Sequence, residues 1–171
     1  MHNALFPGTF DPPSLGHLDI IKRASTVCDK LYVGIAVNRS KKNSLFFPEE
    51  KLELLRTMTK DLANVEVLSF SGLVIDFAQK HNIHVILRGL RAFSDFEYEF
   101  RMALANRKMS GLETMFLMAD ERYSYLSSTL IRDIASHGRR LTDFVPPEIE
   151  DKVFNRLAER YAKEIKAHHE I

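Results

Sequence analysis

Residues 3–17 read NALFPGTFDPPSLGH, and this stretch decides how the chain begins to fold. Its first four residues form a short apolar run that stops at Pro7-Gly8. From Gly16 onward, apolar residues recur at the spacing of an amphipathic helix. The stretch therefore predicts a strand, a loop stiffened by prolines, and a helix that begins beside His17.

The same alternation continues along the rest of the chain. Short β-rich runs predict further strands at residues 31–37, 65–70, 85–87 and 114–118. Helical spacing and end signals predict helices from Pro48, over 73–80, after a Ser94–Glu97 capping box, over 129–137 and over about 148–168. Alternating strands and helices predict an α/β fold with a parallel sheet, in a single domain over residues 1–171.

Composition excludes several classes of protein. Of the 171 residues, 45% are hydrophobic and 27% charged, which is typical of a folded globular chain. No transmembrane segment or signal peptide is visible. The single cysteine, Cys28, excludes an intramolecular disulfide and a Cys-rich zinc site, so we expect a reducing, cytoplasmic setting. The net charge of +1 lacks the basic excess of a nucleic-acid-binding protein.

The glycine and histidine spacings remove the common nucleotide and metal motifs. No two of the seven glycines have the spacing of a G-x-G-x-x-G or Walker A loop, so any bound nucleotide must be held in another way. No H-E-x-x-H is present, and we expect no protein metal site.

The loop after the first predicted strand is the first candidate site. In parallel sheets, ligands bind at the carboxyl ends of strands near a switch in strand order. Gly8 permits close approach of a ligand, Thr9 supplies a hydroxyl, and His17 stands at a helix N-terminus that favours anions. A proline-stiffened loop with a surface histidine is the alternative, but the combination of residues favours a function.

Three further candidates follow later strands. Arg88-Gly89-Leu90-Arg91 comes directly after the fourth strand and suits phosphate binding, although a surface turn paired with Asp95, Glu97 or Glu99 is an equal alternative. Ser127-Ser128-Thr129 opens a helix and offers an anion nest, although an ordinary N-cap is the more common reason for such residues. Lys41 lies in the loop after the second strand.

Together these segments resemble one family, the bacterial phosphopantetheine adenylyltransferases. The resemblance covers about the first 160 residues and is carried by PGTFDP with Gly16-His17, Ser40-Lys41-Lys42, RGLRA followed by DFEYE (residues 88–92 and 95–99), and Ser127-Ser128-Thr129. It implies a Rossmann-like parallel five-stranded sheet with helices on both faces and a C-terminal helix. It also implies transfer of AMP from ATP to 4′-phosphopantetheine, giving dephospho-coenzyme A and pyrophosphate, with Mg²⁺ and as a homohexamer.

The resemblance also implies roles for individual residues. His17 would stabilise the transition state, and Thr9, Lys41 and Arg91 would complete the catalytic set. The substrate 4′-phosphopantetheine would be bound by Thr9, Lys41, Val74 and Arg88. ATP would be bound by Thr9, Phe10, His17, Gly89, Leu90, Arg91, Glu99, Tyr123, Ser124, Tyr125, Leu126, Ser127, Ser128 and Thr129.

Some positions depart from the family pattern, and three alternatives stay open. Ser14-Leu15 stands where Thr-Asn is common, and Tyr123 stands where Trp is common. The alternatives are a sister adenylyltransferase acting on another small phosphorylated substrate, such as nicotinate or nicotinamide mononucleotide, a nucleic-acid-binding module and an inactive structural relative. RGLRA with DFEYE speaks against the first, and the near-neutral charge speaks against the second. The third is disfavoured by the joint presence of His17, Lys41, Arg88 and Arg91.

The helix that carries DFEYE has apolar residues on more than one side. Phe96 and Phe100 can face the core, while Tyr98 and Met102 lie four apart on a different stripe. A second apolar stripe on a surface helix marks a contact more often than bare exposure. We therefore expect self-association through this helix, with burial inside its own subunit as the alternative.

Overall fold

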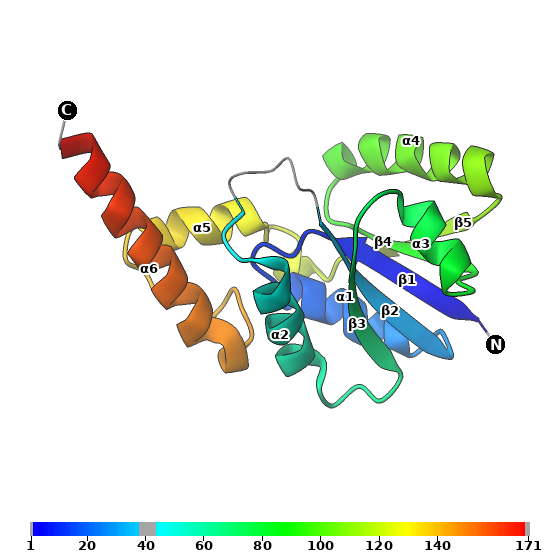
Figure 1. Cartoon of the computed structure of the whole chain (residues 1–171), viewed down its shortest axis with the longest axis horizontal. Helices are drawn as coiled ribbons and strands as arrows, with labels where there is room; N and C mark the ends of the chain where they lie inside the picture. The colour runs from blue at the N-terminus through cyan, green and yellow to red at the C-terminus, as the bar shows by residue number, and fades with distance from the viewer. Residues whose placement is uncertain (1, 38–43, 170–171) are drawn as a thin grey trace.

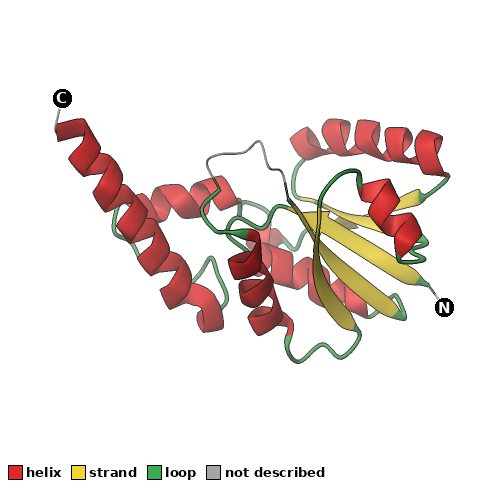
Figure 2. Cartoon of the chain, in the orientation of Figure 1, coloured by secondary structure: helices red, strands yellow, loops and turns green. Residues whose placement is uncertain are grey.

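The computed structural model describes residues 2–37 and 44–169. Within these ranges the chain forms a five-stranded, fully parallel sheet in the order β3-β2-β1-β4-β5, with helices on both faces (Figures 1 and 2). This confirms the predicted fold class. The elements are β1 Asn3–Gly8, α1 Leu15–Ser25, β2 Lys30–Ala36, α2 Pro48–Thr59, β3 Val65–Phe70, α3 Val74–Lys80, β4 Val85–Leu90, α4 Phe93–Ser110, β5 Glu113–Met118, a 3₁₀ turn Glu121–Tyr123, α5 Ser128–Ser136 and α6 Pro147–His169.

The strand order places a switch point beside β1. The chain moves from β1 to β2 and β3 on one side, then returns through α3 to β4 and β5 on the other side of β1. Because strand–helix–strand crossovers are right-handed, α1 and α2 cover one face of the sheet and α3 and α4 cover the other. The carboxyl ends of β1 and β4 therefore lie side by side where the crossovers diverge, which is where ligands bind in such sheets.

The α1/α2 face carries the main core. Inward-pointing residues of the central strands, such as Leu31 and Val33, pack with Ile21 of α1 and Leu55 of α2, and all four are fully buried. The cluster continues into α5 and α6 (Figure 1). Ion pairs of Glu50 and Glu53 on α2 with Arg156 and Lys152 on α6 add to this contact. Here the C-terminal part of the chain completes a core that the crossover helices begin.

The α3/α4 face is covered much more thinly. Its buried cluster comprises only Leu5, Tyr32, Ala78 and Ile83 among the described residues. On α4, Phe96 and Phe100 are 42% and 45% exposed, so the expectation that they face the core is wrong. Other large apolar side chains of α4 are also exposed, namely Tyr98, Met102, Leu104 and Met109. The helix therefore presents an apolar surface to the outside.

Two further predictions need correction. Helix α4 begins at Phe93 with Ala92 at its N-cap and no side-chain cap, so the predicted Ser94–Glu97 capping box is wrong. Leu73, predicted to lie inside, caps α3 and is 55% exposed. The C-terminal helix agrees with its predicted span within one residue at each end. None of the described helices is long and apolar enough to cross a membrane.

Candidate functional site

A pocket of about 360 Å³ opens at the carboxyl ends of β1 and β4. This volume lies within the range of small-molecule sites. Its position is the one predicted from the switch in strand order. The lining residues are Phe6, Pro7, Gly8, Thr9, Phe10, Ser14, Gly16, His17, Ile20, Arg88, Gly89, Arg91, Asp95, Glu99, Ala119, Tyr123, Leu126, Ser127, Ser128 and Thr129.

The loop after β1 is shaped by the burial of Phe10. The Phe10 ring is 1% exposed and makes edge contacts with the rings of Phe6 and His17. Its backbone adopts a φ of 45°, which is strained for a bulky residue. A Cβ at Gly8 would lie 2.8 Å from the Phe10 ring, so only glycine fits there. The buried ring thus supports His17 and leaves Thr9 exposed at the pocket.

His17 is held by the cap of α1. Ser14 is the N-cap: its Oγ accepts from the His17 backbone N–H, and its own N–H donates to His17 Nδ1 at 3.1 Å. Because a backbone N–H can only donate, Nδ1 is an acceptor, and the proton of the neutral ring lies on Nε2. Burial, with smaller contributions from Arg91 and Arg88, lowers the pKa of His17 from 6.5 to about 4. Near neutral pH the ring is therefore an uncharged Nε2–H donor.

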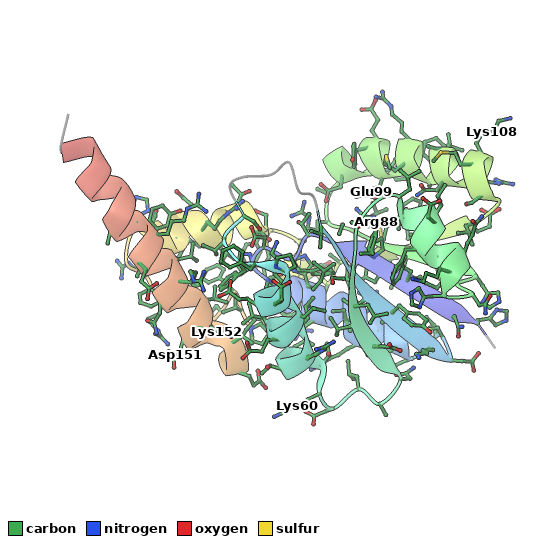
Figure 3. All side chains as sticks on the ribbon, in the orientation of Figure 1. Lys60, Arg88, Glu99, Lys108, Asp151 and Lys152 are labelled. Atoms are coloured by element: carbon green, nitrogen blue, oxygen red, sulfur yellow. The ribbon has the colours of Figure 1, made fainter. Side chains whose placement is uncertain are left out.

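Arg88 bridges β1 and α4. Its Nε and Nη2 donate to the two carboxylate oxygens of Glu99 at 2.6 and 2.5 Å, and its Nη1 donates to the carbonyl of Pro7 at 2.6 Å. Figure 3 shows Arg88 and Glu99 lying together beneath α4. Glu99, predicted to bind ATP, thus uses both oxygens on an arginine in this structure.

Arg91 makes the same kind of bridge, between α4 and the loop before α5. Its Nε and Nη2 donate to the Asp95 carboxylate at 2.9 and 3.2 Å, and its Nη1 donates to the carbonyl of Leu126 at 2.9 Å. Leu126 precedes α5, so Arg91 ties the start of α4 to the loop that leads into α5. The two predicted phosphate-binding arginines therefore line one pocket, each with its plane set by a carboxylate of α4.

The residues at the start of α5 also line the pocket. Ser127 is the N-cap and accepts from the backbone N–H of Leu130, while the Ser128 hydroxyl donates to the carbonyl of Pro12. The capping alternative is therefore correct for Ser127. Ser128 and Thr129 nevertheless line the pocket together with Gly16 and His17, so two helix N-termini open into the same space. Such ends favour anions.

The structure leaves several predicted residues away from the pocket lining. Leu90 is buried and does not line the pocket, and Tyr125 is 56% exposed. Ser124 donates to the carbonyl of Glu121. Val74 packs against the small cluster on the α3/α4 face. Lys41 lies outside the described residues.

Three residues were not predicted as parts of the site. Ser14 orients His17, Asp95 holds Arg91, and the buried Asp11 accepts from the backbone N–H groups of Leu45 and Phe46. Asp11 thereby ties the loop after β1 to the segment that leads into α2. The S-x-x-H spacing of Ser14 could have indicated a capping box in which histidine takes the place of the usual Glu or Gln.

The arrangement suits the binding of a polyphosphate. A neutral histidine donor, two oriented guanidinium groups and two helix N-termini surround one space. All are hydrogen-bond donors, whose natural ligand is a set of anionic oxygens. Such an array stabilises charge that develops on a transferring phosphate group.

The pocket offers no evident metal-ligand set. Asp95 and Glu99, the carboxylates that line it, are both paired with arginines. Across residues 2–37 and 44–169, no group of three or more histidine, cysteine, aspartate or glutamate side chains could hold a metal ion.

Comparison with known proteins gives sequence relatives across almost the whole chain. A family model described as cytidylyltransferase-like matches residues 5–134. The phosphopantetheine adenylyltransferase of Moorella thermoacetica is 52% identical over 157 residues, covering 91% of this chain and 98% of that protein. The phosphopantetheine adenylyltransferase of Clostridium tetani is 55% identical over 150 residues, covering 87% and 93%.

Two crystal structures share the fold at low sequence identity. One, assigned as a nicotinate-nucleotide adenylyltransferase from Vibrio parahaemolyticus, has a TM-score of 0.65 at 18% identity and covers 90% of this chain and 99% of that one. The other, a lipopolysaccharide core biosynthesis protein from Thermoplasma volcanium, has a TM-score of 0.51 at 20% identity and covers 70% and 97%. At these identities the likeness concerns the fold alone.

Proposed function

The chain belongs to the phosphopantetheine adenylyltransferase family, and we propose that the pocket at the ends of β1 and β4 is its adenylyl-transfer site. The protein is a nucleotidyltransferase of coenzyme A biosynthesis that transfers AMP from ATP to 4′-phosphopantetheine. The observation that carries the proposed site is the convergence of His17, Arg88 and Arg91 between two helix N-termini.

The reaction requires positioning and charge stabilisation rather than covalent help. An oxygen of the 4′-phosphate attacks the α-phosphorus of ATP, and the bond from that phosphorus to the bridging oxygen of the β-phosphate breaks. Dephospho-coenzyme A and pyrophosphate result. The attacking phosphate is already anionic at neutral pH, so no general base is needed.

His17 would stabilise the charge that grows on the α-phosphate during attack. Its Nε2–H is fixed by the Ser14 cap on Nδ1, so the ring is oriented before the substrate arrives. Because its lowered pKa leaves the ring uncharged near neutral pH, and the N–H of a neutral imidazole is a very weak acid, His17 would act as a hydrogen-bond donor and not as a proton source. Thr9, exposed beside it, would orient the attacking phosphate.

The two substrates would use different donors. Arg91 and the start of α5 would hold the ATP phosphates, because Arg91 donates to the carbonyl of Leu126, directly before the Ser127 cap of α5. Arg88, with Lys41, would hold the phosphate of 4′-phosphopantetheine. Each arginine keeps two guanidinium N–H groups beyond the three engaged in the structure, which suits a phosphate ligand.

Mg²⁺ is part of this proposal only as an ion carried by ATP. The described residues of the pocket supply no carboxylate set for it, and Mg²⁺ often keeps water and phosphate oxygens as ligands. No step above depends on a metal held by the protein. Chelation should abolish turnover, and added Mg²⁺ should restore it.

We also propose that the protein assembles as a homohexamer. The exposed apolar surface of α4 supports this, because single chains seldom expose so many large apolar side chains on one helix. Light scattering should give a mass near six times 19.7 kDa. A monomer at all concentrations would contradict it. A cytoplasmic location stays a prediction.

A pyrophosphate-release assay tests the function. With ATP and Mg²⁺, we expect turnover with 4′-phosphopantetheine and little with nicotinamide mononucleotide. The named relatives do not favour the second substrate, and the nicotinate-nucleotide protein shares only the fold. Turnover with nicotinamide mononucleotide alone would replace the proposed substrate.

A further inference from the structure

Asp95 makes contacts with Arg91 that set the direction of the guanidinium group. The two side chains form a forked pair, with Nε and Nη2 of Arg91 on the two oxygens of Asp95. The backbone N–H of Arg91 also points to Asp95 Oδ2, at 3.4 Å. A flexible side chain that is partly exposed is thus held at both its backbone and its tip.

The Arg88–Glu99 pair repeats this pattern atom for atom. In both arginines, Nε and Nη2 bind a carboxylate of α4 and Nη1 binds a backbone carbonyl of another wall. Asp95 and Glu99 are four residues apart and lie on one face of α4. Both line the pocket, so the repetition concerns the site and not the outer surface.

A third pair on the same helix shows what an ordinary surface contact looks like. Glu97 and Arg101 also form an ion pair four residues apart, but their side chains are 75% and 74% exposed and neither lines the pocket. Exposed pairs of this kind contribute little to stability. Glu97 therefore provides a matched control for Asp95.

We propose that Asp95 is a positioning residue, which holds the Arg91 guanidinium in the orientation that binds the ATP phosphates. The proposal rests on the proposed adenylyl-transfer site. Three of the five N–H groups of Arg91 are engaged with Asp95 and Leu126, which leaves one on Nη1 and one on Nη2 for a phosphate. Without Asp95, ATP would have to order a long side chain on binding, at a cost in affinity.

The test measures ATP affinity by calorimetry, together with kcat and KM, in the wild type, Asp95→Asn and Glu97→Gln. Because charge-assisted forked pairs are strong but this one is partly exposed, we expect Asp95→Asn to raise the Kd and KM for ATP about 10-fold, with a smaller change in kcat. Glu97→Gln should match the wild type. Wild-type ATP affinity in Asp95→Asn would overturn the proposal.

Repeating the Asp95→Asn substitution in an Arg91→Ala variant separates a positioning role of Asp95 from a purely structural one. In Arg91→Ala, adding Asp95→Asn should cause no further loss of ATP affinity, because Asp95 would act only through Arg91. An equal loss in both backgrounds would overturn the proposal. Asp95→Glu keeps the charge but shifts it by one methylene, so about a threefold rise in Kd is expected, and this variant serves if Asp95→Asn fails to fold. Since ATP binding is measured without the second substrate, the result stands apart from whether 4′-phosphopantetheine is adenylylated.

Discussion

The two walls of the pocket come from opposite faces of the sheet, and the faces are built differently. The α1 wall, with His17, stands on the large core shared by α1, α2, α5 and α6. Among the described residues, α4 contributes none to the small buried cluster on its face of the sheet, and it reaches the site through ion pairs of Asp95 and Glu99 with the arginines of β4 and the segment after it. The α1 wall is therefore organised by packing within the chain, and the α4 wall by charge and, as proposed, by neighbouring subunits.

The first prediction concerns the α1 wall and is the largest effect we expect. His17→Ala should lower kcat about 10²–10³-fold with little change in ATP affinity, because it removes one oriented donor to the transition state. Steady-state kinetics and ATP calorimetry would measure the two quantities. Near wild-type turnover in this variant would remove His17 from the mechanism.

The second prediction follows from the lowered pKa of His17. Between pH 6.5 and 4, the unfolded chain binds a proton that the folded ring does not, so stability falls as the pH falls. The change from 6.5 to about 4 corresponds to about 3 kcal/mol of unfolding free energy, fully present above pH 6.5 and lost on approaching pH 4.

Urea unfolding of the wild type and of His17→Gln at pH 7 and pH 4 would measure this term. Because the variant lacks the titrating ring, the wild type should lose about 3 kcal/mol more than the variant over this range. An equal loss in both proteins would mean that His17 titrates as it does in water.

The third prediction concerns the α4 wall. Arg88→Ala should raise the KM for 4′-phosphopantetheine about 10- to 100-fold and affect kcat less, since the loss is of ground-state phosphate binding. Arg88→Lys should restore only part of the lost 4′-phosphopantetheine binding. The point charge of an ammonium group cannot replace the planar guanidinium that Glu99 orients. If only the KM for ATP rose, the two phosphate positions would be the reverse of those proposed.

The smallest effect is expected on the outer side of α4. Leu104 is 50% exposed, so Leu104→Ser should change the unfolding free energy by less than about 0.5 kcal/mol in dilute solution. It should nevertheless lower the mass seen by light scattering, because the apolar surface would lie between subunits. A large loss of stability with an unchanged mass would place Leu104 within the packing of its own subunit.

The contrast between the walls also explains which predictions from sequence succeeded. The strands, their parallel sheet and the convergence of His17, Arg88 and Arg91 could be predicted, because strand ends and phosphate-binding residue types are local signals. The inward placement of Phe96 and Phe100 was wrong. Helical spacing indicates which side chains are apolar, but it does not indicate whether the surface that buries them belongs to the same chain or to another subunit.

Side-chain partners were predictable only in part. The sequence indicates Asp95 and Glu99 as possible partners of the two arginines, and the structure pairs each carboxylate with one of them. The sequence does not indicate that both pairs line the pocket. Ser14 was missed for a different reason, because its partner at the third helical position is a histidine. The role of Lys41 stays a prediction, since it lies outside the described residues.

Transfer of label from ATP tests the central claim most directly. With ATP labelled at the α-phosphate and 4′-phosphopantetheine, the wild type should place the label in dephospho-coenzyme A and release unlabelled pyrophosphate. His17→Ala should form the same product about 10²–10³-fold more slowly. Label that stays in free AMP or ADP, with none in dephospho-coenzyme A, would contradict adenylyl transfer in this pocket.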